Sequence, residues 1–181
     1  MKPKREPEVV LVRLSHRIMR DVRTTTHCCL VARAFNAKTI YVLGEKEESL
    51  EGTLSTMNET FGSQTKIIFE KQKPVALLKE LQQQGFCVVH LTMYGMPLEE
   101  KLVKLQQQNK MAIVVGSEKV PREVYEQANY NIAVGSQPHS EVAALGITLY
   151  AIHDGTFPTL IGGKKKIIPQ EKGKRVVNPN I

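Results

Sequence analysis

The tripeptide Val-Gly-Ser occurs twice, at residues 115–117 and 134–136, and each copy closes an apolar run and precedes a helix-like segment. A third loop, residues 90–97 (HLTMYGMP), follows another apolar run. Glycine at the end of a buried strand lets a ligand approach the backbone without meeting a Cβ atom. Backbone N–H and C=O groups in such loops can bind an adenine edge or a ribose, and the following helix N-termini add partial positive charge. The loops predict a site for an adenosine-like ligand, although ordinary tight turns between strands and helices have the same spacing.

The segments that would position these loops alternate between two patterns. Apolar runs rich in β-branched residues predict strands, and several runs are continuous, as expected for strands covered on both faces. These runs are 8–14, 39–43, 65–70, 86–91, 111–116 and 129–135. Apolar residues at helical spacing predict helices over 26–37, 75–85, 98–110, 121–129 and 140–152.

The ends of two of these helices carry recognisable signals. Pro121 suits a first helical position and Ser140 suits an N-cap, whereas Gly146 weakens the last helix. Strands and helices that alternate in this way predict an α/β domain with a largely parallel sheet. Because ligands bind outside the carboxyl ends of such strands, the three loops are expected at one edge of the sheet.

The two ends of the chain carry its excess positive charge. Residues 1–23 hold seven Lys or Arg against three acidic residues, and residues 155–181 hold six against one. Such basic ends attract a polyanion such as nucleic acid, or they are solvated, partly disordered tails. Beyond Asp154, two β-like pieces around Gly162–Gly163 predict a hairpin. We therefore expect a domain over 1–154 and a basic hairpin extension over 155–181.

Several classes of protein do not fit this sequence. It has no apolar run long enough for a transmembrane helix and no secretory signal, so a cytoplasmic protein without a membrane partner is expected. Cys28, Cys29 and Cys87 lack the spacing of a metal site and are interpreted as reduced thiols, with no metal and no disulfide. Neither a P-loop motif nor a dinucleotide-binding GxGxxG motif occurs.

Three segments carry a resemblance to a known family. Residues 88–97 (VVHLTMYGMP), 114–145 (VVGSEKVPREVYEQANYNIAVGSQPHSEVAAL) and 13–27 (RLSHRIMRDVRTTTH) resemble the archaeal tRNA 2′-O-methyltransferases that modify cytidine 56 of the T-loop. These enzymes belong to the SPOUT superfamily of knotted methyltransferases. The resemblance covers nearly the whole chain and implies an α/β knot (a deep trefoil knot), a homodimer, S-adenosyl-L-methionine as methyl donor and tRNA as substrate. General rules of chain topology argue against knots, so the residues alone would not predict one.

The resemblance also implies which residues hold the cofactor. In this family the loops of the knot form the cofactor pocket, so the two Val-Gly-Ser loops become two walls of one site. The implied cofactor-binding residues are Leu91, Gly116, Ser117, Glu118, Lys119, Val120, Val134, Gly135, Ser136, Gln137, Pro138, His139, Ser140 and Glu141.

The catalytic arginine departs from the superfamily's better-known pattern. Ribose methylases of the superfamily commonly use an arginine of the first motif, and that position falls on Leu30 here. The resemblance implies that another arginine of the first motif takes this catalytic role, and the candidates are Arg13, Arg17, Arg20 and Arg23. We expect the catalytic arginine to be Arg20 or Arg23, because both precede the predicted helix. These arginines equally suit phosphate binding. Because a guanidinium is a poor proton acceptor, its expected role is to orient a phosphate and to stabilise an alkoxide.

The histidines leave further alternatives open. His139 lies in a cofactor loop and could take a proton, and His16 and His27 could contact RNA, but a lone histidine is more often a hydrogen-bonded structural group. His90 and His153 are interpreted as structural. Two alternative functions also remain: a base methylase acting on guanosine or pseudouridine of tRNA or rRNA, and a catalytically silent RNA-binding module.

Overall fold

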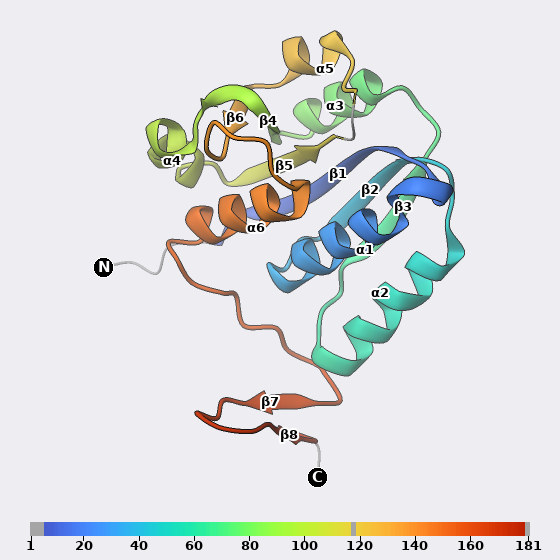
Figure 1. Ribbon diagram of the computed structural model, residues 1–181, viewed down its shortest axis with the longest axis vertical. Coiled ribbons are helices and arrows are strands. Elements are labelled where there is room, and N and C mark those ends of the chain that lie inside the picture. The colour runs from blue at the N-terminus through green and yellow to red at the C-terminus, as the bar shows by residue number, and fades with distance from the viewer. Residues whose placement is uncertain (1–5, 117–118, 180–181) are drawn as a thin grey trace.

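The computed structural model describes residues 6–116 and 119–179. Six parallel strands form one sheet in the order β3-β2-β1-β5-β4-β6, with helices on both faces (Figure 1). The expected α/β class with a parallel sheet is thus confirmed. The strands are β1 Glu8–His16, β2 Thr39–Gly44, β3 Lys66–Glu70, β4 Cys87–Pro97, β5 Lys110–Val115 and β6 Tyr130–Ala133. The helices are α1 Ile18–Ala34, α2 Glu48–Phe61, α3 Pro74–Gln83, α4 Leu98–Gln106, α5 Arg122–Gln127 and α6 Glu141–Ile152.

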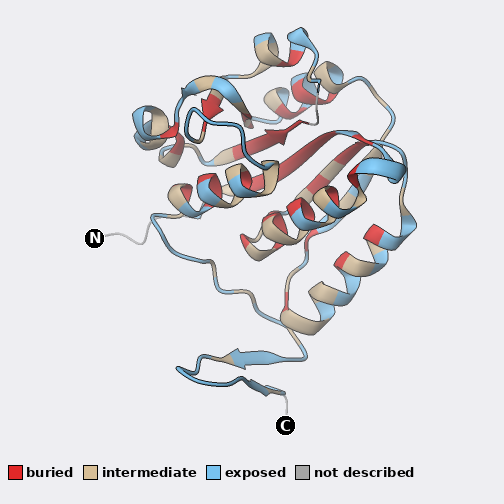
Figure 2. Cartoon of the chain, in the orientation of Figure 1, coloured by how far each residue is buried: buried red, intermediate tan, exposed pale blue. Residues whose placement is uncertain are grey.

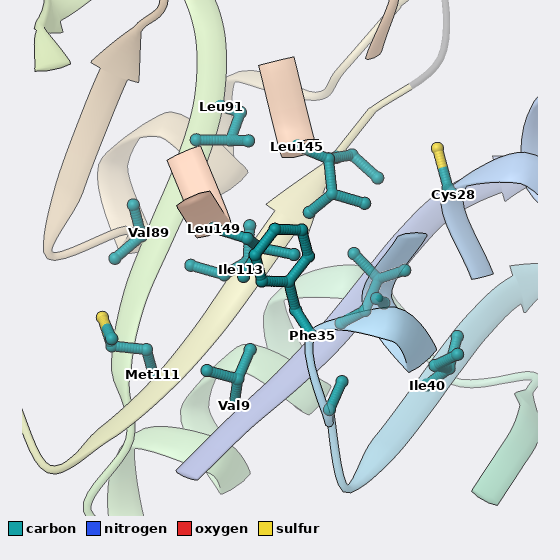
Figure 3. Packing of buried hydrophobic residues seen from close by; sticks show 14 of the residues in the cluster. Val9, Cys28, Phe35, Ile40, Val89, Leu91, Met111, Ile113, Leu145 and Leu149 are labelled. Atoms are coloured by element: carbon teal, nitrogen blue, oxygen red, sulfur yellow. The ribbon is translucent and has the colours of Figure 1, made fainter. Parts of the chain in front are cut away.

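The sheet is the buried layer of the molecule (Figure 2). Alternate residues of β1 point to opposite faces, so that Val9 and Leu11 pack under α1 and α6 while Val10 and Val12 pack under α3. Figure 3 shows the first of these clusters, in which strand residues meet Leu145 of α6. Burial on both faces explains why the strand segments are continuously apolar rather than alternating.

Two helices differ from the predictions. Helix α1 begins at Ile18 rather than at residue 26, so its first two turns include Arg20 and Arg23. Those turns are largely exposed and show no apolar periodicity, although the Asp21 carboxylate accepts hydrogen bonds from the backbone N–H of Arg17 (3.2 Å) and from its Nε (3.0 Å). Helix α2 was not predicted, because only Leu50 and Leu54 of its residues are buried.

The helix signals at residues 121 and 140 have different outcomes. Pro121 is the N-cap of α5 rather than its first helical residue. The Ser140 prediction is confirmed: its Oγ accepts a hydrogen bond from the Ala143 N–H at 3.2 Å, which caps α6. Helix α6 continues through Gly146 to Ile152.

Residues beyond α6 run along the molecule to the end of α2 (Figure 1). The Phe157 ring stacks on Phe35 with centroids 4.8 Å apart. Backbone N–H groups of Lys164 and Lys165 donate to the carbonyl oxygens of Glu59 (3.0 Å) and Thr60 (2.8 Å). Strands β7 Lys166–Ile168 and β8 Arg175–Val177 then pair in antiparallel fashion. The chain therefore turns between residues 169 and 174, and not around Gly162–Gly163 as predicted.

Gly162–Gly163 has another position in the fold. A Cβ atom on Gly163 would lie 2.5 Å from the backbone of Phe61 and Gly62, so a glycine here allows the segment to lie directly against the end of α2. Figure 1 places the β7–β8 pair beyond that end of α2, at the opposite end of the molecule from α5.

Two general properties hold for the described part of the chain. Over residues 6–116 and 119–179, no helix combines the length and apolar character needed to cross a membrane. Within the same ranges, no cluster of three or more His, Cys, Asp or Glu side chains is arranged to hold a metal ion.

Candidate functional site

The bulged second half of β4 and the loops that follow β5 and β6 surround one cavity of about 260 Å³ at the carboxyl edge of the sheet. They meet there because β4 lies between β5 and β6, although β5 comes between β4 and β6 in the sequence. The cavity volume is close to the lower end of the range for ligand pockets, about 300–1,000 Å³. The prediction that the three segments share one edge is confirmed, but residues 90–97 belong to strand β4 rather than to a loop as predicted.

Most of the residues predicted to bind the cofactor surround this cavity. Those that line it are Leu91, Gly116, Val120, Val134, Gln137, Pro138, His139, Ser140 and Glu141. Lys119, Gly135 and Ser136 lie in the same loops without lining it, and Ser117 and Glu118 lie outside the described residues. Five further lining residues lie in the predicted segments but were not named as cofactor-binding residues: His90, Thr92, Met93, Tyr94 and Val115. The lining residues outside those segments, which sequence reasoning missed, are Tyr125, Ile132 and Ala144.

The cavity wall formed by β4 results from an interruption of its pairing with β6. Leu91 pairs with Ile132, and after the bulge Met96 pairs with the same residue. The chain between them therefore projects from the ladder. A Cβ atom on Gly95 would lie 2.5 Å from the backbone of Asn131 and Ile132, so glycine permits this close return.

The cavity has an apolar interior and a polar rim. Leu91, Val115 and Ile132 are buried, whereas His139 and Ser140 are exposed. The N-terminus of α6 also reaches the cavity, because Ser140 and Glu141 both line it. A flat apolar ring, a cationic group and an anionic group would each find a complementary surface here.

His90 is buried in the wall of the cavity. Asn131 Nδ2 donates to the carbonyl oxygen of Tyr125 at 2.9 Å, so Asn131 Oδ1 accepts from His90 Nδ1 at 2.9 Å. The Tyr125 ring meets the imidazole edge-on, with centroids 4.7 Å apart. Burial lowers the pKa of His90 below its ordinary value and favours the neutral ring. These contacts agree with the structural interpretation of His90.

His139 is held by two backbone oxygens. Its Nε2 lies 2.5 Å from the carbonyl oxygen of Val134, and its Nδ1 lies 3.1 Å from that of Ser140. Since a carbonyl only accepts hydrogen bonds, both contacts are satisfied together when both ring nitrogens carry protons. The two contacts raise the pKa of His139 above its ordinary value, because both stabilise the protonated ring.

The arginines of the first motif occupy two different settings. Arg20 and Arg23 are exposed on α1, three residues apart, on a face that they share with His27. Neither arginine lines the cavity of its own chain. Arg13, within β1, is instead buried, and its Nη1 donates to the carbonyl oxygen of Gly116 in the cavity wall.

Comparison with curated proteins identifies close relatives. The chain is 45% identical over 172 residues to the tRNA (cytidine(56)-2′-O)-methyltransferase of Ignicoccus hospitalis, covering 94% of this chain and 77% of that protein. It is 42% identical over 174 residues to the protein of the same name from Nitrosopumilus maritimus, covering 93% and 95% of the two chains.

Solved structures share the fold at low identity. The TrmH/SpoU tRNA modifying enzyme of A. aeolicus superposes with a TM-score of 0.61 at 14% identity, covering 84% of this chain and 77% of that one. An AdoMet-bound rRNA methyltransferase from Sinorhizobium meliloti gives a TM-score of 0.61 at 16% identity, covering 83% of this chain and 57% of that one.

The family model described as tRNA ribose 2′-O-methyltransferase, aTrm56, matches residues 61–177, which include all three segments around the cavity. The chain therefore belongs to the tRNA (cytidine(56)-2′-O)-methyltransferase family.

Proposed function

We propose that this protein transfers a methyl group from S-adenosyl-L-methionine to the ribose 2′-hydroxyl of cytidine 56 in the T-loop of tRNA. The observation that carries the proposal is the cavity at the edge of the sheet, because its three loops lie within the segment that matches the family. The curated relatives bear the name of this activity. The likeness to AdoMet-bound methyltransferases supports the choice of cofactor.

The cofactor residues belong to the three loops. When bound, S-adenosyl-L-methionine supplies an electrophilic methyl group on a cationic sulfur. Leu91 and Val134 offer apolar surface to the adenine, the Glu141 carboxylate offers negative charge to a cationic group, and the N-terminus of α6 suits the carboxylate of the methionine moiety. Gly135, Ser136 and Lys119 support the loop backbones, and Ser117 and Glu118 complete the proposed set.

Arg20 and Arg23 are the proposed catalytic residues. Both are exposed on α1 and lie away from the cavity lining of their own chain, so we propose that they reach the cavity of a second subunit. There they would orient a phosphate of the tRNA and stabilise the developing alkoxide. Because both ring nitrogens of His139 contact backbone carbonyl oxygens, its proposed role is to hold its loop rather than to act as general base.

The knot and the homodimer belong to this proposal. The knot is supported by the fold that the chain shares with TrmH/SpoU methyltransferases. The dimer is supported by the exposure of Ile147 and Tyr150, which lie three residues apart on α6 and offer an apolar surface to a second copy. A tRNA substrate supports a cytoplasmic location, which belongs to the proposal.

The basic extension over 155–181 is the proposed tRNA contact outside the catalytic domain over 1–154. Lys165 and Lys166 are exposed, as are Lys172, Lys174 and Arg175. The β7–β8 pair lies at the other end of the molecule from α5, so the extension suits contact with a part of the tRNA remote from the nucleotide at the cavity of the same chain.

Two measurements test the proposal. Calorimetry should detect binding of S-adenosyl-L-methionine to the protein. Incubation with labelled cofactor should then transfer label to a tRNA transcript but not to the same transcript with 2′-deoxycytidine at position 56. Binding without transfer to either transcript would favour the silent RNA-binding module, and equal labelling of both transcripts would favour a base methylase.

A further inference from the structure

Arg13 connects two walls of the cavity from behind. Its side chain is 1% exposed, and its Nη1 donates to the carbonyl oxygen of Gly116 in the loop after β5. The same Nη1 lies 3.8 Å from Oε1 of Glu141 at the start of α6. Both Gly116 and Glu141 line the cavity, and they approach it from different loops.

A buried polar network holds Arg13 in this place. Its Nε donates to Thr25 Oγ1 at 3.2 Å. Since the guanidinium cannot accept, the hydroxyl hydrogen of Thr25 is available to His16 Nδ1 at 2.9 Å. His16 Nε2 lies 3.3 Å from Glu47 Oε2, but the two atoms do not form a hydrogen bond. The network thus anchors the guanidinium to α1 through Thr25.

We propose that Arg13 is a positioning residue for the methyl-transfer reaction, which fixes the Gly116 carbonyl and the Glu141 carboxylate relative to each other. This inference rests on the proposed function of the cavity. The side chain of Glu141 is 37% exposed, so without Arg13 its carboxylate is free to turn into solvent. With Arg13, one rigid planar group contacts both segments and sets the separation of the Gly116 carbonyl and the Glu141 carboxylate.

Burial gives a reason to assign this role rather than one in stability. A buried charged group costs desolvation free energy, and an apolar side chain of similar volume often stabilises a fold as well or better. The arginine therefore contributes little net stability that an apolar residue could not provide. Its specific contribution is the geometry of the cavity wall.

The same chain offers a matched control in Arg33. This residue is also buried, its Nε donates to Asn58 Oδ1 at 3.2 Å, and its Nη2 donates to the carbonyl oxygen of Gly62. It therefore makes the same kinds of contact, but at the end of α1 and outside the lining of the cavity.

The test compares Arg13→Lys with Arg33→Lys in the full-length protein. Lysine keeps the charge but cannot reproduce the planar set of donors. Calorimetry with S-adenosyl-L-methionine should give about 10- to 100-fold weaker binding for R13K, which corresponds to loss of hydrogen bonds to a charged group. The KM of R13K for the cofactor should rise by a similar factor. R33K should bind the cofactor as tightly as the parent protein, although its melting temperature should fall by about as much as that of R13K. Parent-like affinity in R13K, or equal weakening in both variants, would overturn the proposal.

A second measurement keeps the test decisive if R13K folds poorly. Thr25→Val removes the acceptor of the Arg13 Nε and leaves the arginine in place, and it should weaken cofactor binding in the same direction by a smaller factor. In the background of Glu141→Gln, the effect of either change should shrink, because the two residues act together. Fully additive effects would refute coupling through Glu141. A parent protein that binds no S-adenosyl-L-methionine would refute the proposed function itself, and the inference with it.

Discussion

Replacing Gly116 by alanine would place a Cβ atom 2.2 Å from Cγ2 of Val120. Ordinary van der Waals contacts of such atoms are 3.4–4 Å, so the Val120 side chain must move by roughly 1 Å. The backbone of Gly116 does not have the positive φ that disfavours alanine, which makes this contact the main cost. Overpacking of this kind costs about 1–3 kcal/mol, and in a chain of this size each 1 kcal/mol lowers the melting temperature by about 2–4 °C.

Thermal unfolding should therefore show a melting temperature about 2–12 °C lower for Gly116→Ala than for the parent protein. Both residues line the cavity, so calorimetry should also show weaker binding of S-adenosyl-L-methionine. Val120→Ala removes the clashing methyl group, and the double variant should recover most of the melting temperature that G116A loses. A G116A protein that melts and binds like the parent, or a double variant without recovery, would refute the reasoning.

Three further predictions concern other parts of the protein. Gly135 has φ +71°, and a Cβ atom there would meet nothing within 4 Å. Gly135→Ala should therefore cost only the strain of a left-handed backbone, about 1–2 kcal/mol. Asparagine tolerates this conformation better, so Gly135→Asn should unfold at a higher temperature than G135A, and the reverse order would contradict this account. Neutralising Lys164, Lys165 and Lys166 should weaken tRNA binding and flatten the plot of log affinity against log salt. Lys164 Nζ already pairs with Glu59 at 2.8 Å, so we expect phosphate contacts from Lys165 and Lys166 only. Loss of these two contacts should reduce the slope of that plot by about 1.4–1.8. Neutralising the exposed Lys71, Lys73 and Lys79 is the control, and equal slopes for both triple variants would contradict a specific contact. Because the pKa of His139 is raised, its contacts stabilise the loop fully at pH values below the unfolded-state pKa of about 6.5. This stabilisation is lost as the pH rises through the folded-state pKa. An NMR titration that gives His139 a pKa at or below 6.5 would show this to be wrong.

The sequence supports prediction of the strands better than of their order. Burial on both faces leaves an unmistakable continuous run such as 111–116, but nothing local to that run places β5 between β1 and β4. That order arises from packing between segments distant in the chain. The start of α1 was missed for a different reason: its first two turns are exposed, as Met19 at 96% illustrates, so hydrophobic periodicity carries no signal there.

Some residues of the candidate site could likewise be predicted from the sequence, and others could not. Glycine at strand ends and the cap at Ser140 follow from local chemistry, so the three loops could be located from the sequence. The contribution of Tyr125 could not, because it depends on how α5 packs against β4. Arg13 was considered only as one member of an arginine cluster. An arginine within a strand gives no local sign that it will be 1% exposed and will meet a carbonyl group 103 residues away.

The most direct test of the central claim is the position and chemical nature of the transferred methyl group. A tRNA transcript labelled from S-adenosyl-L-methionine by the purified protein is partially hydrolysed by alkali and resolved by nucleotide. A 2′-O-methyl group blocks cleavage at its own 3′ phosphodiester. The predicted result is a ladder that lacks only the product of cleavage after nucleotide 56, with the label located at that nucleotide. Label at another nucleotide, or at nucleotide 56 without a gap, would contradict the assignment of this protein as a cytidine 56 ribose methylase.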